Sequence, residues 1–140
     1  MYKLIQAVKL SEGFRDRVYK DTLDIDTIGY GFAIKDLVLD EDICDMILER
    51  KLKSLINRVH KKFPFVEDLP EEAQEVVYEM CYQLGLRGFS KFKKTIQFLR
   101  LENYKVCADE MLDSRWARQT PNRAQRLSNI IREIQSEFGN

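Results

Sequence analysis

The chain has 140 residues, 44% of them hydrophobic, which is enough for one compact domain with a buried core. Its 23 basic and 23 acidic side chains cancel, so no overall charge draws it to a polyanion. It has no apolar run of membrane-spanning length and no secretory segment at its N-terminus, which predicts a protein made in a cytoplasm without stable membrane association.

The first predicted element is a short amphipathic helix over residues 2–12. Leu4 and Val8 recur at helical spacing, and Gly13 suits a C-terminal cap. Glu12 lies four residues after Val8 and therefore on the same apolar stripe. Desolvation on that stripe would favour the protonated carboxyl group, which is the form that a general acid needs near neutral pH.

A β-hairpin is predicted next. Residues 15–20 form a β-prone segment, residues 22–26 a polar turn, and residues 27–32 a second strand whose glycines mark places where the backbone approaches another group. The hairpin would bring Asp21, at the end of the first strand, close to Thr27, at the start of the second. Both would then face the end of the first helix.

These three side chains are the groups that hydrolysis of a glycoside by water requires. Glu12 would protonate the leaving oxygen, while Asp21 and Thr27 would deprotonate or orient the water. In inverting glycosidases the two carboxyl groups stand roughly 6.5–9.5 Å apart to leave room for that water. The alternative is structural, with Glu12 at a helix end and Asp21 in a turn, and residue types alone favour it.

The rest of the chain is predicted to be helical. Asp40 caps a helix that ends at Lys62, with an acidic first turn and a basic last turn, as the helix dipole favours. Pro70 begins a helix that is apolar nearly all round, and Gly85 ends it. Three more helices are predicted. One begins after residue 90, and a second covers residues 103–113. The third begins at a Thr120 cap and Pro121, and its packing residues are Leu127, Ile130, Ile131, Ile134 and Phe138.

The cysteines and the histidine indicate no redox or metal chemistry. Cys44, Cys81 and Cys107 are widely spaced in apolar helical contexts, which predicts buried reduced thiols. His60 precedes two lysines, which is typical of a solvated helix position. No metal-ligand spacing joins these residues, so we expect no metal and no other cofactor.

The sequence predicts the environment of two residues near the C-terminus, Trp116 and Arg123. Trp116 lies on a short turn between predicted helices, where a core position is expected rather than a platform for a sugar ring. Arg123 lies in the first turn of the last helix, where a positive charge is unfavourable, so a compensating carboxylate is expected nearby.

Three blocks of residues follow one another along most of the chain. The first is E-G-x-R-x-x-x-Y-x-D-T with T-I-G-x-G, over residues 12–22 and 27–31. The second is S-R-W with Q-T-P-N-R-A-x-R, over residues 114–126, and the third, weaker block consists of Met80, Gln83, Gly85 and Phe92. Together they resemble the phage-type lysozymes, the endolysins related to T-even phage lysozyme.

The resemblance implies an α+β, mainly helical, lysozyme-like fold. A small β-hairpin lobe would cover about residues 13–40, and a linking helix about residues 41–62. Residues 1–12 and 63–140 would form a helical lobe, so that the whole chain makes one lysozyme-like domain.

The resemblance also implies a role for each matching residue. Glu12 would be the general acid, Asp21 the general base or water-orienting carboxylate, and Thr27 the residue that holds the water. Arg123 matches the arginine that approaches the acid in this family. The residues that match substrate contacts in the cleft are Tyr82, Gln83 and Thr95.

The activity implied is that of a peptidoglycan hydrolase. It would cleave the β-1,4 bond between N-acetylmuramic acid and N-acetylglucosamine, with inversion, and so lyse bacteria as a monomeric antimicrobial enzyme. The resemblance to phage endolysins implies a location in the bacterial host's cytoplasm until release to the cell wall.

This chain departs from the family pattern in its small lobe. Phe32 stands where the family has a histidine, so packing is expected in place of a buried ion pair. The turn over residues 23–26 lacks the usual glycine. The segment over residues 32–39 is short, which predicts that the lobe has lost a helix.

Three alternatives to the hydrolase remain. A lytic transglycosylase needs the acid without a water-positioning partner, so Asp21 and Thr27 argue against it. A non-catalytic wall-binding module on the same scaffold would fit the altered lobe. Residues 87–140 carry 11 basic and 6 acidic side chains, whereas residues 1–86 carry 12 basic and 17 acidic ones. The basic C-terminal part suits binding to an anionic wall polymer. The third alternative is that it binds nucleic acid, but the sequence has no groove-reading motif.

Overall fold

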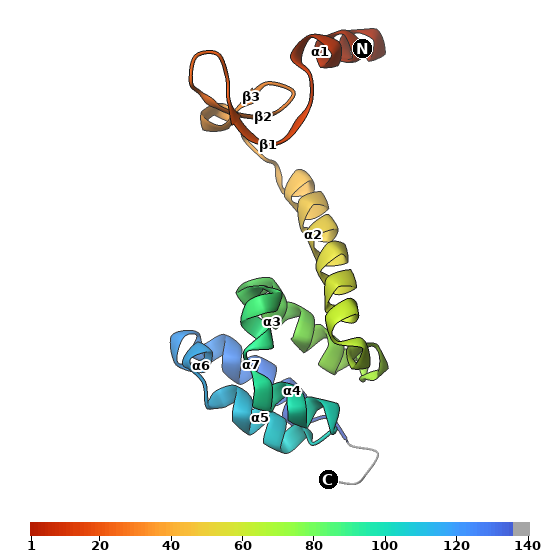
Figure 1. The fold of residues 1–140 in the computed structure, drawn as a ribbon, viewed down its shortest axis with the longest axis vertical. Coiled ribbons are helices and arrows are strands. Elements are labelled where there is room, and N and C mark those ends of the chain that lie inside the picture. The colour runs from red at the N-terminus through yellow and green to blue at the C-terminus, as the bar shows by residue number, and fades with distance from the viewer. Residues whose placement is uncertain (136–140) are drawn as a thin grey trace. The chain divides into compact units, whose positions relative to one another are not determined.

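The structure is a computed structural model that describes residues 1–135. The chain divides into two compact units, which we call unit 1 (Met1–Asp45) and unit 2 (Met46–Asn140). Unit 1 holds a helix and a small antiparallel sheet, and unit 2 is helical, as the ribbon in Figure 1 shows. The predicted α+β, mainly helical class is confirmed. None of the described helices is long and apolar enough to cross a membrane.

Unit 1 begins with helix α1, Tyr2–Glu12, as predicted. Gly13 ends it with a φ of 69°, and the Gly13 N–H donates to the Lys9 carbonyl at 2.9 Å. The apolar stripe is exposed, however, since α1 has no buried residue. The desolvation expected for Glu12 is therefore not found in unit 1. Because α1 belongs to unit 1, its place in a helical lobe stays a prediction.

The sheet has three antiparallel strands in the order β1–β2–β3: β1 is Arg15–Lys20, β2 is Asp26–Gly29 and β3 is Phe32–Ala33. The prediction of one strand over residues 27–32 was wrong. Gly29 and Gly31, with φ of 69° and 76°, turn the chain at Tyr30, so the segment folds back on itself as two short strands. A left-handed backbone at two positions is what only glycine adopts freely.

The hairpin segment leads through a 3₁₀ turn, Ile34–Asp36, into helix α2, Glu41–Lys62. Only Leu55 and Val59 are buried on α2, so other side chains cover this helix fully only in its C-terminal part. Cys44, in the first turn, is exposed, which corrects the expectation of a buried thiol there.

Up to residue 135, unit 2 contains the C-terminal part of α2, a 3₁₀ turn and five further helices. They are η2 (Pro64–Asp68), α3 (Glu71–Ser90), α4 (Lys93–Arg100), α5 (Tyr104–Leu112), α6 (Arg115–Gln119) and α7 (Pro121–Arg132). Helix α5 packs against α4 and α7, and α3 against α7. Gly85 interrupts α3 with a φ of 76° and a ψ of 157°, so the predicted helix end is a kink with one more turn beyond it.

The core of unit 2 forms as the helical periodicity predicts. Trp116 is 4% exposed and packs in this core, which confirms the expectation of a buried position. Cys81 and Cys107 are also buried, and burial raises the pKa of each thiol to about 12. The largest fully buried side chains are Tyr104, Phe89, Met80, Leu99, Met111, Leu127 and Ile131.

The start of α7 differs from the expectation in one respect. Pro121 occupies the first helical position, as predicted. Thr120 does not cap the helix through its hydroxyl, because Oγ1 donates to the Trp116 carbonyl at 3.0 Å and so closes α6 instead. The predicted packing residue Phe138 lies outside the described residues.

Candidate active-site residues and a basic pocket

The carboxyl group of Glu12 lies against the backbone of Gly31. A methyl group built on the Gly31 Cα would stand 2.5 Å from Glu12 Oε2. The last residue of α1 is therefore brought to the turn between β2 and β3. The expectation that a glycine in this segment marks a close approach is confirmed, and Gly31 leaves room for the carboxyl group because it has no side chain.

Asp21 follows β1 and organises the turn after it. Its Oδ1 accepts hydrogen bonds from the N–H groups of Leu23 at 2.8 Å and Ile25 at 2.9 Å. Asp24, in the turn over residues 23–26, takes a positive φ of 63°, which aspartate tolerates better than most residues. The carboxylate of Asp21 is thus held in one orientation, with its second oxygen free of hydrogen bonds among the described residues.

Thr27 shares a backbone partner with Asp21. Its Oγ1 donates to the Ile25 carbonyl at 2.7 Å, while the Ile25 N–H donates to Asp21. Thr27 is 3% exposed and pairs with Tyr19 of β1. Because the Thr27 hydroxyl donates its proton to the Ile25 carbonyl, its oxygen can only accept a further hydrogen bond. The predicted juxtaposition of Asp21 and Thr27 through a hairpin is found within unit 1.

An aromatic group surrounds the turn that contacts Glu12. The Tyr30 ring lies 5.3 Å from the Phe14 ring and 6.3 Å from the Phe32 ring, and the Lys9 ammonium stands 5.3 Å from its centroid. Phe32, where the resemblance led us to expect a histidine, packs on this group and against Gly29 while remaining half exposed. The interactions are aromatic and cation–π contacts, which sequence reasoning did not foresee for Phe14 and Tyr30.

In unit 2, Gln83 is oriented by a buried tryptophan. Trp116 Nε1 donates to Gln83 Oε1 at 2.9 Å, so the amide nitrogen of Gln83 remains as the donor for another group. Tyr82, the neighbouring predicted substrate contact on α3, is 48% exposed. The tryptophan that the sequence assigned to the core therefore also positions a candidate binding residue.

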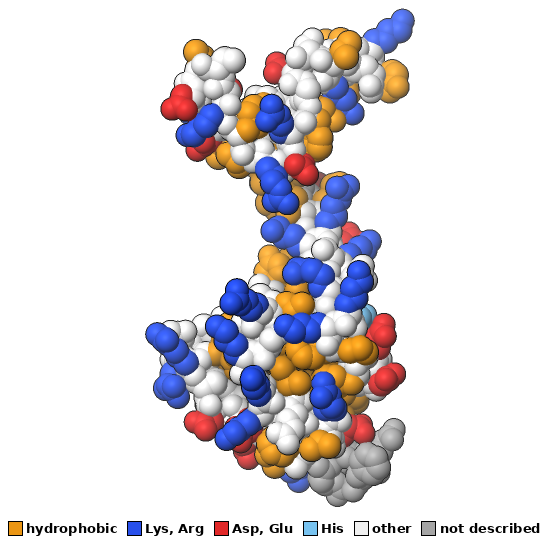
Figure 2. Space-filling model, in the orientation of Figure 1, with side chains coloured by type: hydrophobic (Ala, Val, Ile, Leu, Met, Phe, Trp, Pro, Cys, Tyr) orange, Lys and Arg blue, Asp and Glu red, His pale blue; other side chains and the backbone are white. Residues whose placement is uncertain are grey.

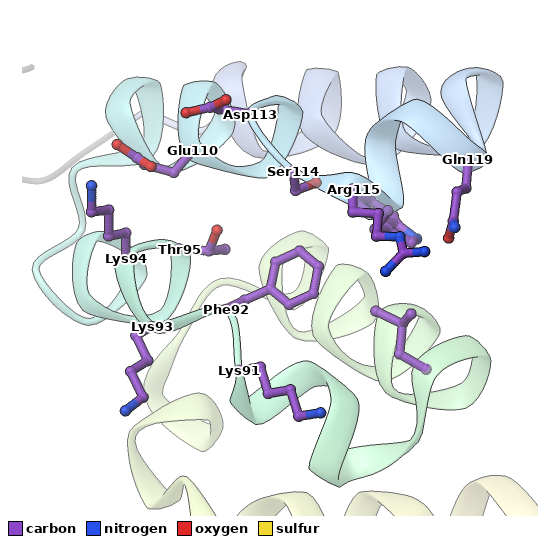
Figure 3. Close-up of a pocket in the computed structure, with 12 residues that line it drawn as sticks. Lys91, Phe92, Lys93, Lys94, Thr95, Glu110, Asp113, Ser114, Arg115 and Gln119 are labelled. Carbon is purple, nitrogen blue, oxygen red and sulfur yellow. The ribbon is translucent and has the colours of Figure 1, made fainter.

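A cavity of about 470 Å³ opens between α3, α4, α5 and α6 of unit 2 (Figure 3). Thr95, a predicted substrate contact, lines it, whereas Tyr82 and Gln83 do not. Its charged lining is mainly basic, in agreement with the Lys and Arg side chains gathered over unit 2 in Figure 2. The lining residues are Leu84, Lys91, Phe92, Lys93, Lys94, Thr95, Glu110, Asp113, Ser114, Arg115, Trp116 and Gln119.

Most of this pocket was missed from the sequence. The signal available was the run from Lys91 to Lys94 beside an aromatic residue, together with the S-R-W block, but nothing in the sequence says that the two segments meet. The chemistry of the lining suits an anionic group that also presents apolar surface to Phe92 and Trp116.

Arg123 finds its carboxylate in Glu79 of α3. Arg123 Nε donates to Glu79 Oε2 at 2.8 Å, and Arg126 donates to the same oxygen. Partial burial disfavours the charged form of Glu79, but the hydrogen bonds and charges of Arg126 and Arg123 outweigh it and lower the Glu79 pKa. A compensating carboxylate is thus present in unit 2, and the support of Glu12 by Arg123 stays a prediction.

The described part of the chain has no cluster of side chains that could bind a metal ion. No group of three or more His, Cys, Asp or Glu side chains among residues 1–135 is arranged to hold an ion.

Comparison with known proteins adds to this geometry. The family model described as phage lysozyme matches residues 9–133. Two curated relatives, both from Dictyostelium discoideum, are described as probable T4-type lysozyme 1 and probable T4-type lysozyme 2. They are 23% and 27% identical to this chain, and each alignment covers 89% of this chain and 90% of the relative.

Proposed function

This chain belongs to the phage lysozyme family, and from the premise that it is a lysozyme-like peptidoglycan hydrolase we propose that it cleaves the β-1,4 bond between N-acetylmuramic acid and N-acetylglucosamine. The observation that carries the proposal is the arrangement in unit 1. Glu12 meets the turn at Gly31, while Asp21 and Thr27 are fixed through a shared backbone partner. An acid and a water-binding pair thus stand in one small unit.

The proposed reaction uses three groups. Protonated Glu12 gives its proton to the glycosidic oxygen as the bond to the anomeric carbon breaks. The carboxylate of Asp21 takes a proton from the attacking water, and the Thr27 oxygen accepts the other hydrogen of that water and so orients it. Attack from the face opposite the leaving group inverts the configuration at the anomeric carbon.

Unit 2 supplies the proposed contacts to the rest of the substrate. The amide nitrogen of Gln83, oriented by Trp116, donates to an oxygen of the glycan, and the exposed ring of Tyr82 packs on a sugar. Thr95 and the basic pocket bind anionic groups of the wall polymer. We retain Arg123 as the residue that supports the acid, by resemblance alone.

Glu12→Gln tests this proposal. The substitution keeps the size and removes the acidic proton, so turbidity clearing of outer-membrane-permeabilised bacteria should fall by about 10² or more. Circular dichroism checks that the variant folds, and pelleting with isolated walls checks that it still binds. Full clearing by folded Glu12→Gln would exclude the acid role. A folded wild-type protein that binds walls without clearing them would instead favour the non-catalytic module.

The biological setting is a separate proposal that rests on the resemblance to endolysins. The protein would act as a monomer, accumulate in the cytoplasm of a bacterial host, and lyse it only after gaining access to the wall. Expression in bacteria with and without a co-expressed membrane pore tests this. Lysis only with the pore supports the proposal, and lysis without it contradicts it.

A further inference from the structure

His60 was expected to be a solvated helix residue, and the structure corrects this. Its Nε2 lies 2.6 Å from the Tyr78 hydroxyl oxygen, and its Nδ1 lies 3.1 Å from Glu67 Oε1. The side chain is 23% exposed. Both ring nitrogens of the only histidine in the chain are therefore engaged by side chains.

The contacts continue through Gln74. Tyr78 Oη stands 3.3 Å from Gln74 Oε1, and Gln74 Nε2 donates to the carbonyls of Glu67 at 3.1 Å and Leu69 at 2.8 Å. His60 is in the last turn of α2, Glu67 is in η2, and the other two side chains are on α3. One chain of hydrogen bonds thus joins three consecutive elements of unit 2.

Which of these hydrogen bonds form depends on the protons that His60 and the Tyr78 hydroxyl carry. Burial and the nearby Glu67 charge raise the Tyr78 pKa, so its hydroxyl keeps its single proton. Neutral His60 with its proton on Nδ1 donates to Glu67, and Nε2 then accepts the Tyr78 proton. In that state the Tyr78 hydroxyl has no proton left for Gln74.

Protonation of His60 reverses the direction of one bond. Both ring nitrogens then donate, Nδ1 to Glu67 and Nε2 to the Tyr78 oxygen, which frees the Tyr78 proton for Gln74 Oε1. Every contact in the chain is then a satisfied hydrogen bond. The positive charge also stands in the last turn of α2, where the helix dipole favours it.

We propose that His60 is a proton-operated latch at the corner formed by the end of α2, η2 and the start of α3, and that the Tyr78 hydroxyl switches its hydrogen-bond acceptor from His60 to Gln74 when His60 is protonated. Among the described residues, the titratable side chains that His60 contacts through a hydrogen bond or ion pair are Glu67 and Tyr78. Of the two lysines that follow it, Lys62 lies over the Phe63 ring. The Tyr78 hydroxyl thus donates to Gln74 when His60 is protonated and to His60 when the ring is neutral.

Nuclear magnetic resonance tests the latch without ambiguity, because every histidine signal comes from one residue. In ¹⁵N-labelled protein above the transition, Nδ1 should show the shift of a protonated nitrogen and Nε2 that of an acceptor. The Gln74 side-chain amide should shift with the same midpoint as the imidazole. A neutral ring protonated on Nε2, or a Gln74 amide that ignores the His60 transition, would overturn the proposal.

Tyr78→Phe gives the matched variant, with Tyr82→Phe on the same helix as the control. Tyr78→Phe should abolish the response of the Gln74 amide while His60 still titrates, and Tyr82→Phe should preserve it. An unchanged response in Tyr78→Phe would contradict the switch. If Tyr78→Phe does not fold, Glu67→Ala serves instead: without the carboxylate that accepts from Nδ1, the neutral His60 ring should no longer hold its proton on Nδ1 alone, and an unchanged Nδ1 signal counts against the latch.

Discussion

At the scale of single residues, Asp21 combines two tasks in one side chain. Oδ1 binds two backbone N–H groups of the turn, and the negative charge is what the proposed water activation needs. Asparagine and alanine variants separate these tasks, because an asparagine oxygen accepts the same hydrogen bonds without the charge, whereas alanine accepts none.

We predict that Asp21→Asn lowers kcat by about 10² or more while the thermal midpoint stays close to wild type. Asp21→Ala should lose the activity and also about 1–3 kcal/mol of unfolding free energy, because both turn hydrogen bonds are lost. Wall-clearing rates and urea unfolding of the two variants provide the measurement. Near wild-type activity in Asp21→Asn would rule out the base role.

Gly31 and Gly29 form a natural pair for a second test. Both have a positive φ, so alanine at either costs about 1–2 kcal/mol of backbone strain. The new methyl group at Gly31 would meet Glu12, whereas at Gly29 it would meet the Phe32 ring.

Gly31→Ala should therefore lower kcat by about 10², through displacement of the acid, and Gly29→Ala should lower it only a few-fold at a similar loss of stability. Activity per folded molecule, with the folded fraction from circular dichroism, checks the difference. Equal activity losses in the two variants would show that the Glu12 contact does not matter.

At the scale of elements, one carboxylate joins α3 to α7. Glu79 accepts from both Arg123 and Arg126, and all three side chains are partly exposed. Because the folded-state pKa of Glu79 lies below its ordinary value, its contribution to stability is present above the unfolded pKa and is lost as the pH falls through the folded one.

Glu79→Gln should lower the unfolding free energy by about 1 kcal/mol at pH 7 and by less at pH 3, where the wild-type carboxylate is also being protonated. Urea denaturation at the two pH values measures both numbers. Asp109→Asn, which removes the partner of Arg132 in a more exposed pair, is the control and should cost less. A penalty for Glu79→Gln that grows toward pH 3 would contradict the assignment.

Helices α1 and α2 were predictable because their signals are local. The bounds of α1 and α2 follow from apolar spacing, charged ends and Gly13, and each agrees with the structure to within one residue. The split of residues 27–32 into two strands was not predicted, since a T-I-G-Y-G-F run is β-prone throughout and only the two positive φ angles reveal the turn.

The candidate site was predictable only in part, because sequence patterns report contacts between residues that are close in the chain. Asp21 and Thr27 are close in sequence, and a hairpin brings them together in almost any register. The contacts of His60 with Tyr78 and of Arg123 with Glu79 join residues 18 and 44 positions apart, and no local pattern encodes them. Exposure of Cys44 also escaped prediction, because helical periodicity shows an apolar stripe without showing what covers it.

At the scale of the whole molecule, the residues assigned by resemblance are divided between the units. The proposed acid, base and water ligand are in unit 1, and the proposed glycan contacts and the basic pocket are in unit 2. Except at Arg123, which we retain as the residue that supports the acid, wall binding and bond cleavage are therefore expected to respond to substitutions in different units.

The double substitution Lys91→Gln/Lys93→Gln should weaken binding to isolated walls about threefold or more at low salt, with kcat per bound enzyme unchanged, and the difference should shrink as salt screens the charges. Lys3→Gln/Lys35→Gln removes the same charge from unit 1 and is the control. Pelleting assays across a salt series measure both. Equal weakening by the two pairs would show that net charge, rather than the pocket, attracts the wall.

The most direct test of the proposed reaction is digestion of purified peptidoglycan in H₂¹⁸O, followed promptly by mass spectrometry of the released fragments. Hydrolysis by a water held at Asp21 and Thr27 predicts muropeptides with an N-acetylmuramic acid reducing end that carries one ¹⁸O atom. Unlabelled fragments ending in an anhydro-sugar would contradict the account and identify a lytic transglycosylase instead.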